Sequence, residues 1–99
     1  MTEQKRVGEL LRDLRQSRGD SLRSAARELG VDAAHLSRLE RGLKPASDEL
    51  RDRVADYYSY SPELIDLAQG RLPADILEIL QQHPDLLGEL RSRFGANDE

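Results

Sequence analysis

Residues 21–42 constrain the fold of this chain more than any other part of its sequence. Two runs of apolar residues with helical spacing lie there, and only residues 29–32 separate them. Gly30 supplies a backbone conformation that residues with a Cβ resist, and Val31 is expected to fill the space beneath the turn. Ala26 is small, as a helix that crosses its neighbour closely requires. The segment therefore predicts two short helices held at a fixed crossing angle.

The rest of the sequence also predicts helices, and strand patterns are nearly absent. Apolar residues recur at spacings of three and four, and glycine or proline marks the ends of most runs. We expect helices at residues 5–18, 22–29 and 33–41, a fourth capped by Ser47, a fifth from 61 to Gly70, and two helix starts at 72–77 and 83–87. The expected fold is all-α, with one domain at residues 1–70 and a helical extension at residues 71–99.

Composition limits the classes of function. A chain of 99 residues, with 34% charged residues, builds a thin core and leaves little room for a deep catalytic cleft. The absence of cysteine excludes disulfides and thiolate metal sites. The first residues lack the apolar stretch of a signal peptide, and no apolar run reaches membrane-spanning length. We therefore expect a cytoplasmic protein with no membrane partner.

The charges are distributed unevenly along the chain. The net charge is −4, which by itself argues against a nucleic-acid partner. However, residues 1–44 contain ten basic and seven acidic residues, whereas residues 45–99 contain five basic and twelve acidic ones. This asymmetry favours two surfaces with different partners. The alternative is that the acidic half only keeps a small protein in solution.

Catalytic and metal-binding patterns are missing from the sequence. His35 and His83 are the only histidines, and they stand far apart without partner ligands. No nucleophile motif, acid/base pair or phosphate-binding loop is present, so we expect neither an enzyme nor a cofactor. Tyr57, Tyr58 and Tyr60 could stack on bases, but their place among aliphatic residues favours packing in a core or an interface.

Several strings in the first two thirds of the chain form one pattern, namely Leu11-Arg12-Asp13-Leu14-Arg15-Gln16-Ser17-Arg18-Gly19, Ala26, Leu29-Gly30-Val31 and Leu36-Ser37-Arg38-Leu39-Glu40-Arg41-Gly42. With these residues the chain resembles the lambda-repressor-like (Cro/repressor, or XRE) family of helix-turn-helix proteins. The resemblance covers about residues 5–67. It implies a five-helix DNA-binding domain in which helix 33–41 lies in the major groove. It also implies an ion pair between Arg15 and Glu40, which is plausible because a guanidinium can hold a carboxylate bidentately. The alternative is two solvated surface charges.

The resemblance also assigns the DNA contacts. Residues Ala33, Ala34 and Arg38 would meet base edges, with His35 and Ser37 as secondary candidates. An alanine can touch a thymine methyl group but forms no hydrogen bond through its side chain, so direct readout depends on Arg38. Phosphate contacts would come from the amides near Ser21 and from Arg23, Arg41 and Lys44. Leu22 stands where the family often has a glutamine, so the phosphate contact of that glutamine is missing. Arg23 or Arg18 would compensate for the lost contact.

The extension beyond residue 71 lies outside this resemblance and is rich in aliphatic side chains. Two isolated helices cannot bury them all, so we expect homodimerisation through Ile76, Leu77, Ile79, Leu80, Leu86, Leu87, Leu90 and Phe94. A dimer would place two reading helices roughly 34 Å apart, which matches one turn of duplex DNA. The alternatives are that the helices complete the core of their own domain or bind a different protein.

Two hypotheses of function follow. The first is a transcriptional regulator, and more narrowly a repressor, that binds a palindromic operator in double-stranded DNA as a homodimer. The second is an antitoxin or phage-type adaptor on the same scaffold, in which the acidic C-terminal half binds a protein partner. The basic first half favours DNA, whereas Ala33 and Ala34 favour the adaptor.

Overall fold

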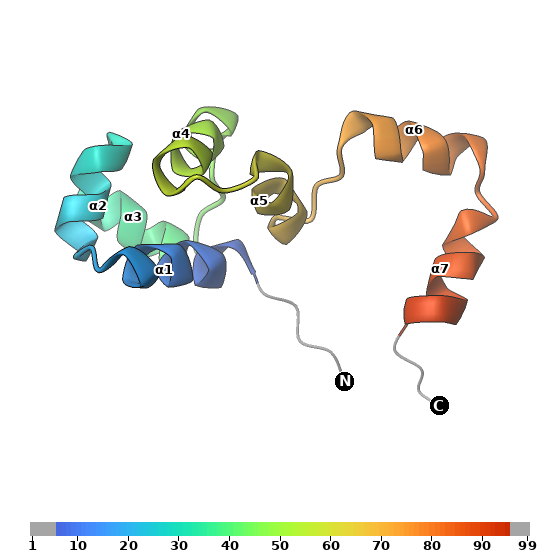
Figure 1. The fold of residues 1–99 in the computed structure, drawn as a ribbon, viewed down its shortest axis with the longest axis horizontal. Coiled ribbons are helices and arrows are strands. Elements are labelled where there is room, and N and C mark those ends of the chain that lie inside the picture. The colour runs from blue at the N-terminus through green and yellow to red at the C-terminus, as the bar shows by residue number, and fades with distance from the viewer. Residues whose placement is uncertain (1–5, 96–99) are drawn as a thin grey trace. The chain divides into compact units, whose positions relative to one another are not determined.

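A computed structural model describes residues 6–95, which form helices and no strands (Figure 1). The helices are α1 (Val7–Arg18), α2 (Leu22–Leu29), α3 (Ala33–Glu40), α4 (Asp48–Tyr58), α5 (Pro62–Ala68), α6 (Ala74–Gln82) and α7 (Leu86–Phe94). The all-α prediction is confirmed. The third helix ends at Glu40, one residue earlier than expected, because Arg41 already has C-cap geometry. The fifth helix ends at Ala68, before Gly70.

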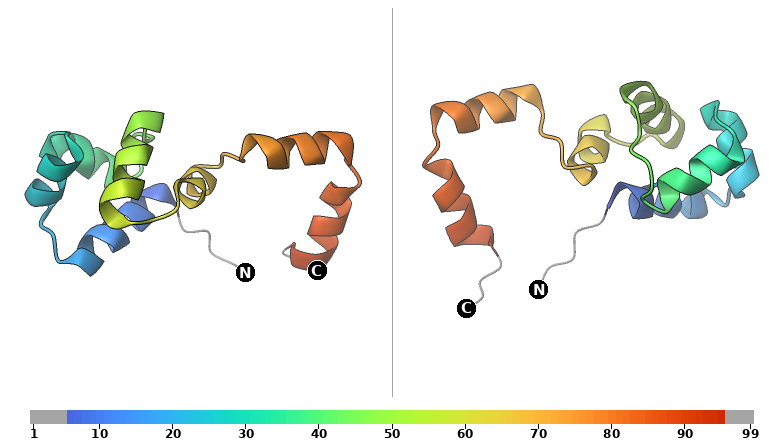
Figure 2. Two further views of the ribbon diagram at one scale, coloured as in Figure 1. Left: turned by 45° about the horizontal axis from the view of Figure 1, so that its top comes forward. Right: turned by 180° about the vertical axis from the view of Figure 1, so that it is seen from behind.

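The described residues fall into two compact units that divide after Arg71. The first unit contains α1–α5 and the second contains α6 and α7 (Figures 1 and 2). The five helices of the first unit are short, and side-chain caps define where most of them begin. The N-cap residues of α2, α3, α4 and α5 are Ser21, Asp32, Ser47 and Ser61, and each of these side chains accepts a hydrogen bond from a backbone amide of the first turn.

The core of the first unit is aliphatic. Its largest fully buried side chains are Leu11, Leu29, Leu36, Leu39, Val54 and Ile65, which come from all five helices. Tyr57 and Tyr58 at the end of α4, and Tyr60 just after it, are half-buried and pack against this core. The structure therefore places them in core packing, which the sequence favours. Burial raises the pKa of Tyr58 to about 12, in keeping with a phenol partly withdrawn from water.

Gly8 sets the separation of α1 and α3. A Cβ at this position would lie 2.8 Å from the carbonyl oxygen of Leu39 and would also overlap the carbonyl oxygen of Glu40. Both obstacles are backbone atoms at the end of α3, so neither can rotate away. Glycine thus allows α1 to approach α3 more closely than any other residue could.

The second unit consists of two short helices without a core of their own. None of the residues of α6 or α7 is buried. Most of the apolar residues in this unit are exposed, namely Leu72, Ile76, Leu77, Ile79, Leu87, Leu90 and Phe94, while Leu80 and Leu86 are half-buried. Across residues 6–95, no helix combines the length and the apolar character needed to cross a bilayer.

Candidate nucleic-acid interface

Helix α3 has one buried side and one exposed side. Leu36, Leu39 and Glu40 face the core, where α3 contacts α1 and α2. On the opposite side, Ala34 and Arg38 are exposed and lie one helical turn apart. The exposed side is therefore an uncovered face within its own unit, with the cation of Arg38 in the last turn of the helix.

Three other predicted base-contact residues are less accessible. Ala33, His35 and Ser37 are half-buried, and Ala33 packs against the core. The backbone amide of His35 donates to Asp32 Oδ1 at 2.7 Å, which fixes the start of the helix. Among the five, Ala34 and Arg38 thus offer most of the surface that a DNA base could touch.

The structure contains the ion pair that the resemblance implies. Arg15 donates two hydrogen bonds to Glu40, from Nε to Oε2 at 2.7 Å and from Nη2 to Oε1 at 3.0 Å. The Glu40 side chain is only 4% exposed, and Arg15 is 16% exposed. This bond with Glu40 raises the pKa of the Arg15 guanidinium above its ordinary value. A bidentate, largely desolvated pair of this kind fixes α3 against α1 and orients its outer face.

A loop with two exposed cations follows α3. Arg41 and Lys44 are both exposed, as the prediction of phosphate contacts requires. The amide of Gly42 donates to Leu39 O at 3.1 Å, and that of Leu43 donates to Arg38 O at 2.9 Å. These bonds end α3 and direct the loop away from it.

The start of α2 carries the other predicted phosphate contacts. Ser21 and Arg23 are exposed, and Ser21 Oγ accepts from the Ser24 amide at 3.0 Å. Arg18 is used differently: its guanidinium stacks over the Tyr57 ring, 4.3 Å from the centroid, and donates to the Tyr57 carbonyl. Both arginines expected to compensate for Leu22 are exposed, but Tyr57 holds the guanidinium of Arg18.

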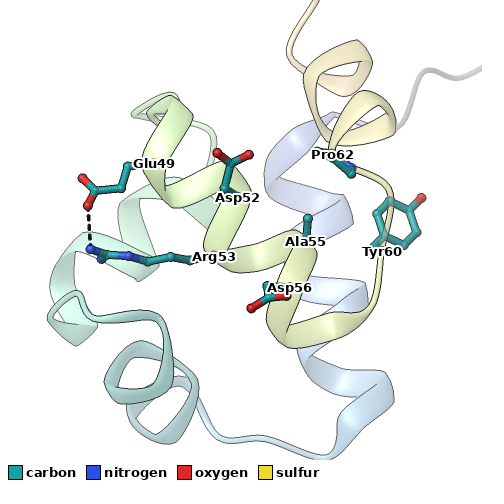
Figure 3. A pocket seen from close by; sticks show the side chains of 7 residues that line it. All are labelled: Glu49, Asp52, Arg53, Ala55, Asp56, Tyr60 and Pro62. Carbon is teal, nitrogen blue, oxygen red and sulfur yellow. Dashed lines mark hydrogen bonds and ion pairs between the residues drawn. The ribbon is translucent and has the colours of Figure 1, made fainter.

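A shallow depression on α4 and the start of α5 has the opposite charge (Figure 3). It is lined by Glu49, Asp52, Arg53, Ala55, Asp56, Tyr60 and Pro62. Arg53 bonds Glu49 at 2.8 Å and also donates to the carbonyl oxygen of Leu29, so its charge is already partnered. The remaining carboxylates would repel phosphate, which leaves α3 and its flanking loops as the candidate interface.

Metal ligands do not gather anywhere in residues 6–95. No group of three or more His, Cys, Asp or Glu side chains in this range is arranged to hold a metal ion. The carboxylates instead form ion pairs with arginines, such as Asp66 with Arg51 at 2.8 Å.

Besides the stacking of Arg18 on Tyr57, two contacts near the interface were missed by sequence reasoning. One is the close approach of α1 to α3 at Gly8, for which a glycine inside a helical pattern was the available signal. The other joins Gln69 Oε1 to the backbone amide of Ala46 at 2.7 Å. No sequence pattern signals that bond, because its donor is a main-chain group 23 residues away.

Comparisons with known proteins agree with this geometry. A family model described as a helix-turn-helix domain matches residues 6–68. The clp gene regulator ClgR from Corynebacterium glutamicum has a similar structure, with a TM-score of 0.58 and 27% sequence identity over 94% of this chain and 95% of that chain. These findings confirm the resemblance and the five-helix domain with its C-terminal helices.

A chain from the complex of the SinR protein with the SinI protein is also similar in structure. Its TM-score is 0.57, and it is 20% identical over 91% of this chain and 99% of that chain, which supports the fold alone. Both alignments cover more than nine tenths of this chain, so they continue past residue 68 into the last two helices. The comparison with curated proteins found no match.

Proposed function

The chain belongs to the XRE-like helix-turn-helix domain family of DNA-binding regulators, and we propose that it is a homodimeric repressor that binds a palindromic operator. In this proposal residues 1–70 bind DNA and residues 71–99 form the dimerisation element. The observation that carries it is the uncovered face of α3, which a buried ion pair between Arg15 and Glu40 holds against α1. A rigid helix with one free face is what entry into a major groove requires.

Base recognition is assigned to this face. Arg38 is exposed and can bind the O6 and N7 atoms of a guanine through two hydrogen bonds. Ala34 offers a methyl group to thymine, and the half-buried Ala33, His35 and Ser37 contribute at the edges of the contact. Because one arginine carries most of the hydrogen bonding, DNA shape is expected to add to the discrimination.

Phosphate contacts are assigned to both sides of α3. Arg41 and Lys44 follow the helix, while Arg23 and the amides beside Ser21 lie at the start of α2. The two groups would contact the phosphate backbones that border the groove. They supply affinity that is independent of sequence and falls as the salt concentration rises.

Substitution of two arginines separates the two roles. Arg38→Ala is expected to lower the preference for cognate over random duplex about tenfold or more, because a bidentate guanine contact discriminates by about 1–3 kcal/mol. Arg41→Ala is expected to weaken cognate and random duplexes alike. Fluorescence anisotropy with both duplexes measures each effect. Equal losses from both variants on both duplexes would remove Arg38 as the base reader.

The dimer is assigned to the extension because its apolar side chains lack a cover within their own unit. Ile76, Leu77, Ile79, Leu87 and Leu90 are each 40–47% exposed, and Phe94 is 78% exposed. The contact set proposed for the dimer also includes the half-buried Leu80 and Leu86. Isolated pairs of short helices with an exposed apolar surface are unstable in water, and a second copy would provide the missing cover.

Substitutions that introduce charge into this apolar surface test the dimer. Leu77→Asp combined with Leu90→Asp is expected to weaken self-association at least tenfold, because two carboxylates would have to lose water at the interface. Sedimentation of the whole chain measures the association. Leu43→Asp is the control, since Leu43 is 66% exposed but lies in the loop after α3. An unchanged dimer in the double variant, or a wild-type chain that sediments as a monomer, contradicts the assignment.

Selection of bound duplexes from a random pool tests the function as a whole. A homodimer with twofold symmetry is expected to recover an inverted repeat whose half-sites lie one or more helical turns apart. Repression then follows where such a site overlaps the binding site of RNA polymerase. Recovery of a single half-site, or of no sequence, contradicts the proposed operator.

A protein partner is the second candidate function. The SinR chain, which shares this fold, is found in a complex with the SinI protein. The acidic residues of α4 leave a negative depression to which a basic partner could bind, as an antitoxin or adaptor would require (Figure 3). Failure of the wild-type chain to bind any duplex at low salt would favour this candidate.

A further inference from the structure

We propose that Gln69 is a positioning residue for DNA binding, because its side-chain oxygen holds the loop between α3 and α4 where Lys44 can reach a phosphate. The inference rests on the proposed function, which assigns the phosphate contact to Lys44. Gln69 itself lies at the C-cap of α5 and would not touch DNA. Gln69 would affect DNA binding by fixing the backbone of the loop that carries Lys44.

The first end of this loop is fixed by α3. Gly42 has a φ of 77° and donates its amide to Leu39, and the amide of Leu43 donates to Arg38 O at 2.9 Å. This pair of bonds is a common way for a helix to end, and it sets the direction in which the chain leaves α3.

The second end is fixed by Gln69. Ala46 is 1% exposed, and its amide donates to Gln69 Oε1 at 2.7 Å. Directly afterwards Ser47 caps α4 by accepting a hydrogen bond from Leu50. Between the two fixed ends only Lys44 and Pro45 remain, and both are exposed. The position of the Lys44 backbone is therefore determined by the two ends.

The backbone and the side chain of Gln69 are both held in place. Its own amide donates to Ile65 O and Asp66 O in the last turn of α5, and Ile65 is fully buried. The Nε2 atom of Gln69 is buried without a hydrogen-bond partner within the described residues. Reversing the amide would place this donor against the Ala46 amide, so the bond to Ala46 fixes the orientation of the side chain.

The exposed ion pair between Arg71 and Asp48 cannot replace this bond, and the more buried pair of Arg51 with Asp66 joins α4 to α5 without binding the loop backbone. Arg71 pairs with Asp48 at 3.1 Å, but the two side chains are 45% and 76% exposed. Salt screens an exposed pair of this kind, so it contributes little to the path of the loop. The bond from Ala46 is shielded from solvent. Without it, a buried amide would lack a partner, and the loop would relax toward water.

The test is the dependence of duplex affinity on salt, measured on the whole chain. Lys44→Ala is expected to reduce the slope of log K against log salt by about one, and the affinity near 0.1 M salt about tenfold. Gln69→Met keeps the length of the side chain and removes the acceptor, and it is expected to give the same losses. The double variant is expected to match Lys44→Ala. Gln69→Glu retains the acceptor and is expected to retain the wild-type slope.

Each other outcome contradicts either the role of Gln69 or the phosphate contact of Lys44. A wild-type slope in Gln69→Met, beside a reduced slope in Lys44→Ala, removes Gln69 as a positioning residue. Additive losses in the double variant would mean that Gln69 acts on DNA binding by a route other than Lys44. A wild-type slope in Lys44→Ala removes the phosphate contact itself, which is a failure of the proposed function. Val54→Ala changes a fully buried core residue of α4 and is the control for stability; a reduced slope in that variant would show that loss of stability alone explains the effect.

Discussion

Arg15→Met is expected to lower the free energy of unfolding by about 3 kcal/mol, because it leaves the buried carboxylate of Glu40 without its bidentate partner. The Glu40 side chain is 4% exposed, so water cannot replace the two lost hydrogen bonds. Arg12 remains 3.6 Å from Glu40, but it is 46% exposed and gives a weaker contact. For a domain of this size, the loss corresponds to a fall in Tm of roughly 12–24 °C. Differential scanning calorimetry measures it.

The double variant Arg15→Met, Glu40→Met is the matched control. Replacing both charges with apolar side chains of similar volume removes the stranded carboxylate, so most of the lost stability is expected to return. A single variant as stable as the wild-type chain would contradict a desolvated Glu40. A double variant less stable than Arg15→Met would show that Glu40 keeps a favourable contact without Arg15, such as the one with Arg12, and is not stranded.

Gly8→Ala is expected to lower the free energy of unfolding by about 3 kcal/mol, at the upper end of the range for an overfilled core. The added methyl group would overlap the carbonyl oxygens of Leu39 and Glu40. Relief requires α1 to move away from α3, which also disturbs the Arg15–Glu40 pair. Chemical denaturation with urea measures the loss.

Gly88→Ala is the control for the helical environment. Gly88 lies inside α7, and a Cβ there would meet no atom within 4 Å. Because alanine favours the helix over glycine by about 1 kcal/mol, this variant is expected to be neutral or stabilising. Equal effects of the two substitutions would mean that the space beside Gly8 is not restricted.

The sequence was sufficient to predict the helices of the first unit and the exposed side of α3. Glycines and capping residues mark the helix ends, and the spacing of Leu36 and Leu39 shows which side of α3 is buried. The ion pair of Arg15 came from a family resemblance, since many pairs of charged residues on separate helices would be equally plausible. Local patterns therefore gave the elements, and the resemblance gave one contact between them.

The missed contacts depend on how the elements meet. Arg18 has the pattern of a free surface cation, but the path of α4 brings the Tyr57 ring under its guanidinium. Gln69 bonds a main-chain amide in a loop that precedes it by more than twenty residues. Partners of this kind are set by the packing of whole helices, which side-chain periodicity does not encode.

Backbone amide shifts on addition of DNA test whether the exposed side of α3 enters the major groove. Nuclear magnetic resonance spectra of the whole chain would be recorded with and without the duplex recovered by selection. If α3 does so, the largest shifts are expected in residues 33–44 and near residues 21–23. Shifts confined to α4–α7, with α3 unchanged, would contradict this placement.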